Sequence, residues 1–530
     1  MVQWLAMSDV LRRQAGILIP LFSCPSSTSW GIGDIGDLIP LTAWLAGAGQ
    51  RVLQLLPINE MASGQQSPYS ALSAMAIDPI YIRLPDVQEF AATGGEGSLK
   101  PADRDLLEAV RAASKIDYEG VHRLKHAALR ASFERFISSE WGHDTSRARD
   151  LKAFISEQAW WVEDYALFRA IHASHGERPW TEWPVALQRR EPADIDRARR
   201  ELMSDVLFYQ YVQWQATTQW HAARGQTHGV ALFGDLPFMV DADSADVWAR
   251  QYQFRLDASI GAPPDAFSAT GQNWGMPLYR WDVIAAEHFR WLHERVRRSA
   301  DLFEGYRIDH LVGFYRTFAW PKDGGEPFFT PADEHTQIAL GERLLSIFRE
   351  IGSIVVAEDL GTVPDFVRAS LAHLGVPGFR VLRWERKWHT DGQPFRDPAE
   401  YPVISVATSG THDTESLAAW WEHSSATERE QIVALPTVQR IAGNADLASA
   451  RYNPAVRDAL LEALFAAGSN LLLLPLIDVF GWTARINEPA TIGGDNWTFR
   501  LPWPSDKLGD IPEARERQDA LKRWTIRYGR

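Results

Sequence analysis

Residues 353–358 read Ser353-Ile354-Val355-Val356-Ala357-Glu358, a short apolar run that ends on a carboxylic acid. A run that is hydrophobic at successive positions is typical of a strand buried on both faces, as in a parallel sheet covered by helices. The acid that ends the run then lies at the C-terminal edge of the sheet, where α/β barrels carry their functional groups. The segment therefore indicates both a fold class and the place where a site should lie.

Seven more runs of this kind recur along the chain, each bounded by Gly, Pro or a charged residue. They span residues 16–20, 51–57, 230–235, 305–309, 378–384, 403–409 and 470–478. Amphipathic, helix-like stretches lie between them, for example at residues 364–374 and 456–467. Eight strands that alternate with helices predict an α/β fold, a (β/α)8 TIM barrel with mainly helical insertions between its strands.

The spacing of the runs predicts how the domain is organised. We expect residues 1–530 to form a single catalytic barrel domain. Residues 60–226, between the second and third runs, are far more than one crossover helix needs, and charged residues alternate there with Leu, Phe and Trp. We expect this segment to be an inserted, largely helical subdomain. Residues 239–277 are rich in Gly, Pro, Ala and Ser, which favours a loop insertion over the mouth of the barrel.

Composition narrows the class of ligand and the location of the protein. The formal net charge of −14 disfavours nucleic acid and anionic membrane surfaces as partners, since both attract basic proteins. The single cysteine, Cys24, excludes an intrachain disulfide, and the N-terminal residues lack the pattern of a signal peptide. We therefore expect a cytoplasmic protein. The 23 tryptophans offer flat apolar faces that suit sugar rings.

An arginine and an acid share one face of the fourth run. Side chains alternate along a strand, so Arg307 and Asp309 point the same way while Ile308 points the other way. An adjacent guanidinium lowers the pKa of a carboxyl group and keeps it ionised, as a nucleophile requires. The pair indicates either a catalytic carboxylate or a structural ion pair at the rim of the barrel.

Two further acids follow other strands. Glu358 leaves a buried strand for a partly desolvated position, which raises the pKa of a carboxyl group as a general acid requires. Asp359 is equally acidic, and either residue could instead cap a loop or helix. Asp413 follows the seventh run and is either a functional acid or the cap of the next helix, while His412 donates to a substrate hydroxyl or satisfies a loop carbonyl.

Taken together, Asp309, Glu358 and Asp413 lie at or just past the C-terminal ends of the fourth, fifth and seventh predicted strands, at the edge where barrel enzymes place their chemistry. Two carboxyl groups about 5 Å apart on either side of a glycosidic bond let one attack the anomeric carbon while the other protonates the leaving oxygen. This arrangement predicts retention of configuration. Asp241, Asp243 and Asp246 lack the spacing of a calcium loop, and we expect neither a metal nor a cofactor.

Several blocks of sequence resemble those of a known family. They are 30–34 (WGIGD), 67–69 (SPY), 234–237 (GDLP), 243–248 (DSADVW), 267–272 (FSATGQ), 274–275 (WG) and 277–279 (PLY). Together with the acids, these blocks resemble the 4-α-glucanotransferases of the amylomaltase or disproportionating-enzyme type, glycoside hydrolase family 77, which are relatives of the α-amylases. The resemblance covers nearly the whole chain.

This resemblance implies roles for individual residues. Asp309 matches the nucleophile of the family, Glu358 the acid/base and Asp413 the acid that steadies the distorted sugar. The remaining matches are to substrate-contacting positions: Arg307, His412, Tyr69, Asp235, Phe267, Trp274, Asn487 and Asn496. Phe267 and Trp274 match the loop over the cleft, and Tyr69 matches an aromatic residue that stacks on a sugar ring.

The activity implied by the resemblance is transfer of a 1,4-α-D-glucan segment to the 4-hydroxyl of a glucan or glucose acceptor, through a covalent glycosyl-enzyme on Asp309. The partners would be an α-1,4-glucan or maltooligosaccharide donor and a sugar acceptor. An α-glucan hydrolase could use the same acids, with water taking the place of the acceptor. A non-catalytic glucan-binding protein is the alternative from another class.

Overall fold

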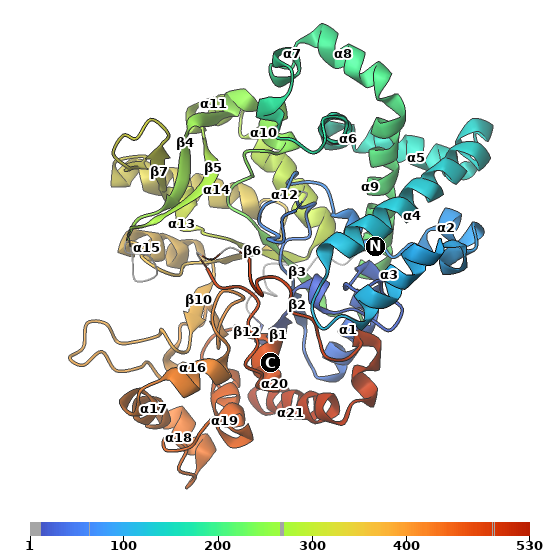
Figure 1. Cartoon of the computed structure of the whole chain (residues 1–530). Coiled ribbons are helices and arrows are strands. Elements are labelled where there is room, and N and C mark those ends of the chain that lie inside the picture. Colours follow the sequence, from blue (N-terminus) through green and yellow to red (C-terminus); the bar gives the residue numbers. More distant parts are fainter. Residues whose placement is uncertain (1–11, 63, 265–269, 490, 492) are drawn as a thin grey trace.

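A closed parallel barrel forms the centre of the computed structural model, which describes residues 12–62, 64–264, 270–489, 491 and 493–530 (Figure 1). Its strands are β1 (Gln14–Leu18), β2 (Val52–Gln54), β3 (Ala231–Leu236), β6 (Gly305–Ile308), β9 (Ile354–Ala357), β10 (Gly378–Val381), β11 (Ser405–Thr408) and β12 (Leu471–Pro475). Around the barrel they follow one another in the order β1-β12-β11-β10-β9-β6-β3-β2. Each strand begins within two residues of the start of a predicted run, which confirms the (β/α)8 prediction.

The two faces of each strand bury different sets of apolar side chains. One set fills the inside of the barrel: Val52, Phe233, Ile354, Val356, Phe379, Val406, Leu471 and Leu473. Because side chains alternate, the inward face of β9 continues from Val356 to Glu358, and that of β3 continues from Phe233 to Asp235. The alternation of side chains along each strand therefore decides which polar groups lie at the end of this apolar interior.

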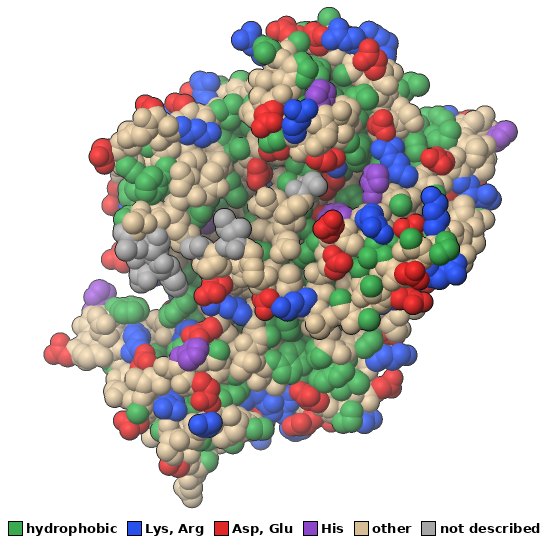
Figure 2. All heavy atoms as spheres, viewed as in Figure 1, with side chains coloured by type: hydrophobic (Ala, Val, Ile, Leu, Met, Phe, Trp, Pro, Cys, Tyr) green, Lys and Arg blue, Asp and Glu red, His purple; other side chains and the backbone are tan. Residues whose placement is uncertain are grey.

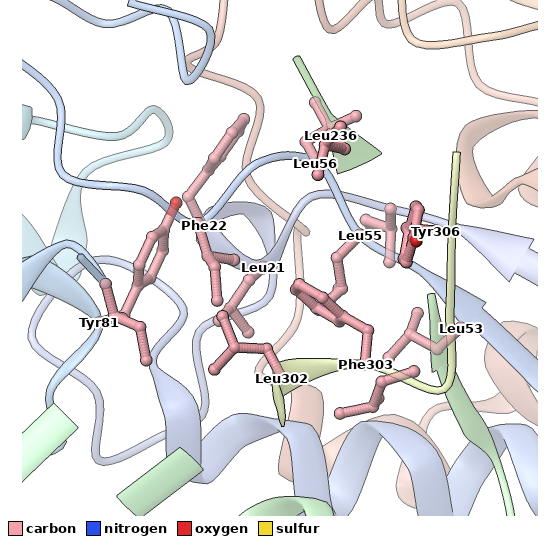
Figure 3. Close-up of a cluster of buried hydrophobic side chains, with 14 of the residues drawn as sticks. Leu21, Phe22, Leu53, Leu55, Leu56, Tyr81, Leu236, Leu302, Phe303 and Tyr306 are labelled. Atoms are coloured by element: carbon pink, nitrogen blue, oxygen red, sulfur yellow. The ribbon is translucent and has the colours of Figure 1, made fainter. Parts of the chain in front are cut away.

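The outward faces pack against the surrounding helices. Figure 3 shows one such cluster, in which Leu53, Phe303 and Tyr306 point toward one another. Tyr306 is buried, and its hydroxyl donates to the backbone carbonyl of Phe348, 2.5 Å away, at the end of a covering helix. Burial on both faces explains why the strands are apolar at nearly every position in the sequence.

Helices surround the barrel. Those that cover its strands are α1 (Leu38–Gly47), α9 (Met203–Arg224), α12 (Arg290–Leu302), α14 (Glu334–Arg349), α15 (Asp365–Leu374), α19 (Pro454–Phe465), α20 (Leu476–Phe480) and α21 (Pro512–Tyr528). Between β11 and β12 the chain also forms α16 (Leu417–His423), α17 (Ala426–Val433) and α18 (Pro436–Ala442). Among the described residues, no helix combines the length and apolar character needed to cross a bilayer.

The long segment between β2 and β3 is largely helical. Besides α9 it contains α2 (Gln88–Ala92), α3 (Pro101–Ala112), α4 (Tyr118–Ser139), α5 (Ser146–Glu157), α6 (Ala159–Ser174), α7 (Val185–Gln188) and α8 (Pro192–Glu201). In Figure 1 these helices lie together on one side of the barrel, opposite α16, α17 and α18. They form a wall beside the C-terminal ends of the first strands.

Residues 239–277, which the sequence predicts to be a loop, contain regular structure instead. After α10 (Ala245–Ala249), strands β4 (Phe254–Ala262) and β5 (Gln272–Tyr279) join β7 (Thr317–Pro321) and β8 (Phe328–Thr330) in an antiparallel sheet of order β5-β4-β7-β8. The short helices α11 (Trp281–Ala286) and α13 (Val312–Tyr315) follow β5 and β6. The pairing of β4 with β5 shifts register on both sides of Ser259, and these irregularities break the alternation that marks a strand in sequence.

A substitution at Gly16 would test how tightly side chains fill the inside of the barrel. A Cβ on Gly16 would lie 2.4 Å from the Val52 carbonyl oxygen on the neighbouring strand. We expect Gly16→Ala to lower the free energy of unfolding by roughly 1–3 kcal/mol, because the backbone of β2 cannot move away. Thermal or urea unfolding measures this loss. Gly509→Ala is the matched control, since no atom lies within 4 Å of the added carbon; an equal effect in both variants would contradict the explanation.

Candidate active site

A cleft of about 1310 Å³ opens at the C-terminal end of the barrel. Its floor includes Asp309, Glu358 and Asp413, the acids singled out in the sequence. One wall comes from the antiparallel sheet and the opposite wall from the chain that follows β10. In Figure 2 the surface is hollowed at the left, below the sheet of β4, β5 and β7. The structure thus brings the three acids into one cavity.

Arg307 connects two carboxylates at the end of β6. Its Nη2 lies 2.8 Å from Oδ1 of Asp309, and its Nη1 lies 2.8 and 2.7 Å from the two carboxylate oxygens of Asp235. Burial by itself lowers the pKa of Arg307, but the charges of Asp235 and Asp309 outweigh burial and raise that pKa well above its usual value. The guanidinium therefore stays charged and holds Asp309 beside it, as the sequence predicts.

Asp235 lies behind this pair instead of facing the cleft. Its side chain is fully buried, and its oxygens are taken up by Arg307 and by the hydroxyl of Tyr69, which donates to Oδ2 at 2.8 Å. Asp235 does not line the large cleft that contains the three acids. It can influence a ligand there only by orienting Arg307 and Tyr69.

Glu358 stands next to Asp309 on the neighbouring strand. β6 and β9 pair in parallel with Ile308 opposite Ala357, so Asp309 and Glu358 are the next residues on the two strands. Burial raises the pKa of Glu358 to about 7; Arg307 opposes this rise, and the negative charge of Asp309 adds to it. Glu358 therefore holds its proton near neutral pH, which confirms the predicted rise in pKa.

Backbone groups fix the Glu358 carboxyl. The N–H of His310 donates to its Oε2 at 2.8 Å, and the N–H of Leu360 donates to its Oε1 at 3.1 Å. Asp359, the alternative acid, is almost completely buried and accepts from the N–H of Phe379 at 2.7 Å and pairs with Arg380 at 3.2 Å. Asp359 therefore links β9 to β10, whereas Glu358 is the acid whose protonated carboxyl group is held in the cleft.

Asp413 belongs to a third group, on the loop after β11. Its Oδ2 lies 3.2 Å from Nε2 of His412, and its Oδ1 accepts from Nδ2 of Asn487 at 2.6 Å. Desolvation by itself raises the pKa of Asp413, but the charge of His412 and the hydrogen bonds from His412 and Asn487 outweigh it and lower that pKa to about 2. Asp413 is therefore an anion at neutral pH.

Tyr69 joins this group to the Arg307 pair. Its ring stacks on the His412 ring with centroids 5.5 Å apart, and Trp497 lies 5.9 Å from both rings. The Tyr69 oxygen is also 3.0 Å from Nε2 of His412. Burial by itself lowers the pKa of His412, but the charge and hydrogen bond of Asp413 and the charge of Asp235 together outweigh it and raise that pKa. Tyr69, His412 and Trp497 thus form an aromatic corner beside the three acids.

Trp274 reaches the cleft from the antiparallel sheet. Its ring meets the ring of His310 edge-on, with centroids 4.8 Å apart, and its indole N–H donates to Oε1 of Gln272 at 3.2 Å. Burial lowers the pKa of His310 to about 4, so this imidazole is neutral. Phe267, predicted to lie over the cleft beside Trp274, falls outside the described residues.

Asn496 is not among the residues that line the cleft. Its Oδ1 accepts from the N–H of Glu488 at 2.8 Å, and its Nδ2 donates to Oγ1 of Thr491 at 2.9 Å, so it braces its own loop. Arg485, which the sequence reading missed, does line the cleft. It donates to the backbone carbonyls of Asp413 at 2.8 Å and Asn487 at 2.7 Å. No local motif reveals that role, because Arg485 lies far along the chain from Asp413.

Comparison with known proteins identifies the family. A family profile described as 4-alpha-glucanotransferase matches residues 19–505. The chain belongs to this family. A 4-alpha-glucanotransferase of Chlamydia pneumoniae is 32% identical over 495 residues, covering 92% of this chain and 91% of the relative. The 4-alpha-glucanotransferase of Thermus thermophilus is 32% identical over 530 residues, covering 96% and 99%.

A solved structure has the same fold. An amylomaltase from Streptococcus agalactiae, in complex with acarbose, superposes with a TM-score of 0.82 at 26% identity, covering 98% of this chain and all of that one. Membership of the 4-α-glucanotransferase family makes the chain an enzyme of the transferase class. The hydrolase and the non-catalytic readings of the sequence are not favoured.

The raised pKa of Glu358 makes stability depend on pH. Between 4.5, the usual value, and about 7 the folded chain keeps a proton that the unfolded chain has released. The free energy of unfolding therefore falls as the pH rises through this window. Glu358→Gln has no proton to lose, so relative to the wild type it should gain at most roughly 3 kcal/mol across the window, and less where water in the cleft screens the charge.

Thermal unfolding of both proteins at about pH 4 and about pH 8 measures this gain, since the two values bracket the window. Glu326→Gln, on the exposed turn between β7 and β8, is the control and should show no such change relative to the wild type. A stability difference between Glu358→Gln and wild type that is the same at both pH values would contradict the raised pKa.

Proposed function

We propose that the enzyme transfers segments of α-1,4-glucans by a retaining double displacement, with Asp309 as nucleophile and Glu358 as acid/base. One observation carries the proposal: two carboxyl groups on adjacent strands face one cleft, and one of them pairs with Arg307 while burial raises the pKa of the other. Parallel strands lie about 4.8 Å apart, which suits the separation of about 5 Å in retaining enzymes.

In the first step, an oxygen of the Asp309 carboxylate attacks the anomeric carbon of the donor sugar. Glu358 gives its proton to the glycosidic oxygen as the carbon–oxygen bond breaks, and the part of the donor beyond that bond leaves with a free 4-hydroxyl. The products of this step are a glycosyl ester on Asp309 and an ionised Glu358.

In the second step, the 4-hydroxyl of an acceptor glucan or glucose enters the place left by the first product. Glu358, now ionised, takes the proton of this hydroxyl, and the acceptor oxygen attacks the anomeric carbon. The ester to Asp309 breaks, and a new α-1,4 bond forms. Two inversions at one carbon give net retention, and the enzyme returns to its starting protonation state.

Asp413 and its neighbours are suited to hold the donor sugar during both steps. An ionised Asp413 fixed by Asn487 can accept hydrogen bonds from ring hydroxyls and stabilise positive charge that develops at the anomeric carbon. Tyr69 offers a flat face to the sugar ring, and His412 offers a donor close to it. Arg307 acts beside them by holding the Asp309 carboxylate in place.

Incubation with maltotriose alone tests the transfer reaction. We expect glucose together with a series of maltooligosaccharides longer than maltotriose, because the glycosyl-enzyme passes its segment to another sugar. Separation of the products by size, with time, measures this outcome. A mixture that contains only sugars shorter than maltotriose would show that water resolves the intermediate and would refute the proposal.

Asp309→Asn tests the nucleophile. The variant should lose turnover by roughly 10⁴-fold or more, because an amide cannot form the glycosyl ester. Its thermal stability should stay close to that of the wild type, since Asp235 still neutralises Arg307 through two contacts. Asp323→Asn, on the exposed turn between β7 and β8, is the matched control and should keep full activity. Near-normal turnover in Asp309→Asn would rule out this mechanism.

A further inference from the structure

Residues 385–396, between β10 and β11, form a hairpin that we call the rim hairpin. Its two arms are joined by hydrogen bonds from the N–H of Arg396 to Glu385 O, 2.8 Å, and from the N–H of Lys387 to Pro394 O, 2.9 Å. In Figure 1 the chain after β10 projects from the barrel opposite the sheet of β4, β5 and β7. The rim hairpin thus forms the outer part of one wall of the cleft.

Side chains fix the rim hairpin to the body of the enzyme. Phe395 is almost completely buried, and the guanidinium of Arg386 lies 3.8 Å from the centre of its ring. Arg386 also pairs with Glu428 of α17 at 3.0 Å, and Lys387 pairs with Glu400 at 2.9 Å. A hairpin held at these points presents its remaining side chains in a defined position.

Unlike Phe395, the side chain of Trp388 in the rim hairpin is not buried. It lines the same cleft as Asp309, yet 54% of its surface is exposed. In the part of the chain that the structure describes, its indole takes part in no hydrogen bond or ring contact. Because this exposed ring lies on the wall of the cleft, a ligand in the cleft can cover it and remove its apolar surface from water.

We propose that Trp388 is the stacking platform of an outer subsite, which binds a glucose unit of a long α-glucan away from the bond being broken. The inference rests on the proposed function and deepens it by naming a preference for long chains. The cleft of about 1310 Å³ exceeds the roughly 300–1,000 Å³ of a typical small-ligand pocket, so it has room for several sugars.

The chemistry of the hairpin fits an uncharged sugar. Arg386 and Lys387 directly precede Trp388 in the chain. Their charges are already neutralised by Glu428 and Glu400. What remains for a ligand is the flat apolar face of the indole and its polar edge. This combination matches a glucose ring, which has apolar C–H faces and a rim of hydroxyls.

Kinetics of Trp388→Ala with donors of two lengths test the outer subsite. With glucose as acceptor, the ratio of KM for amylose to KM for maltotriose should rise about tenfold over the wild-type ratio, equivalent to about 1.4 kcal/mol. Trp388→Phe keeps an aromatic face and should restore most of the wild-type ratio. Tyr252→Ala removes an aromatic residue that is 51% exposed outside the cleft, and should leave the ratio unchanged.

A binding measurement separates this inference from catalysis. In the Asp309→Asn background, calorimetric titration with maltoheptaose should show binding weakened about tenfold by Trp388→Ala, with a smaller effect on maltotriose. An unchanged KM ratio, or an equal loss for short and long sugars, would overturn the outer subsite while leaving the transfer mechanism intact. If the wild-type enzyme makes no longer sugars from maltotriose, the proposed function fails instead.

Discussion

The placement of Arg307 between Asp235 and Asp309 is the interaction on which the rest of the site depends. Without this guanidinium, Asp235 and Asp309 would lie close together at the end of the barrel with no arginine to balance their charges, which would disfavour the ionised form of both. Tyr69 hydrogen-bonds to both Asp235 and His412, and His412 in turn pairs with Asp413. One hydrogen-bonded network therefore joins groups on three parts of the barrel rim.

The same network explains why neighbouring acids behave differently. Glu358 is held by two backbone N–H groups, and burial outweighs the nearby charge of Arg307 and raises its pKa. Asp413 has a histidine and an amide directed at it, and its pKa falls. Each environment forms where the chain leaves a different strand, so the strand ends and the loops that follow them together set the protonation states.

The barrel and the three acids could be predicted from sequence because strands buried on both faces leave continuous apolar runs, and each acid lies at or within a few residues of the end of one. The antiparallel sheet could not, since register shifts in β4 break its alternation and its partner β7 lies far along the chain. Contacts such as Tyr69 with His412 join residues 343 apart and leave no local pattern. Asn496 sits in a familiar motif, but its side chain is occupied within its own loop. Phe267 remains a prediction.

The register of β6 and β9 also bears on how the stereochemistry of such an enzyme could evolve. An inverting mechanism needs a water molecule between its two carboxyl groups and a gap of about 6.5–9.5 Å. Hydrogen bonding between adjacent strands keeps the backbones of the two acids about 4.8 Å apart, which favours the shorter gap. Moving one acid to a strand farther round the wall would widen the gap, and that move requires a change at two positions of the chain.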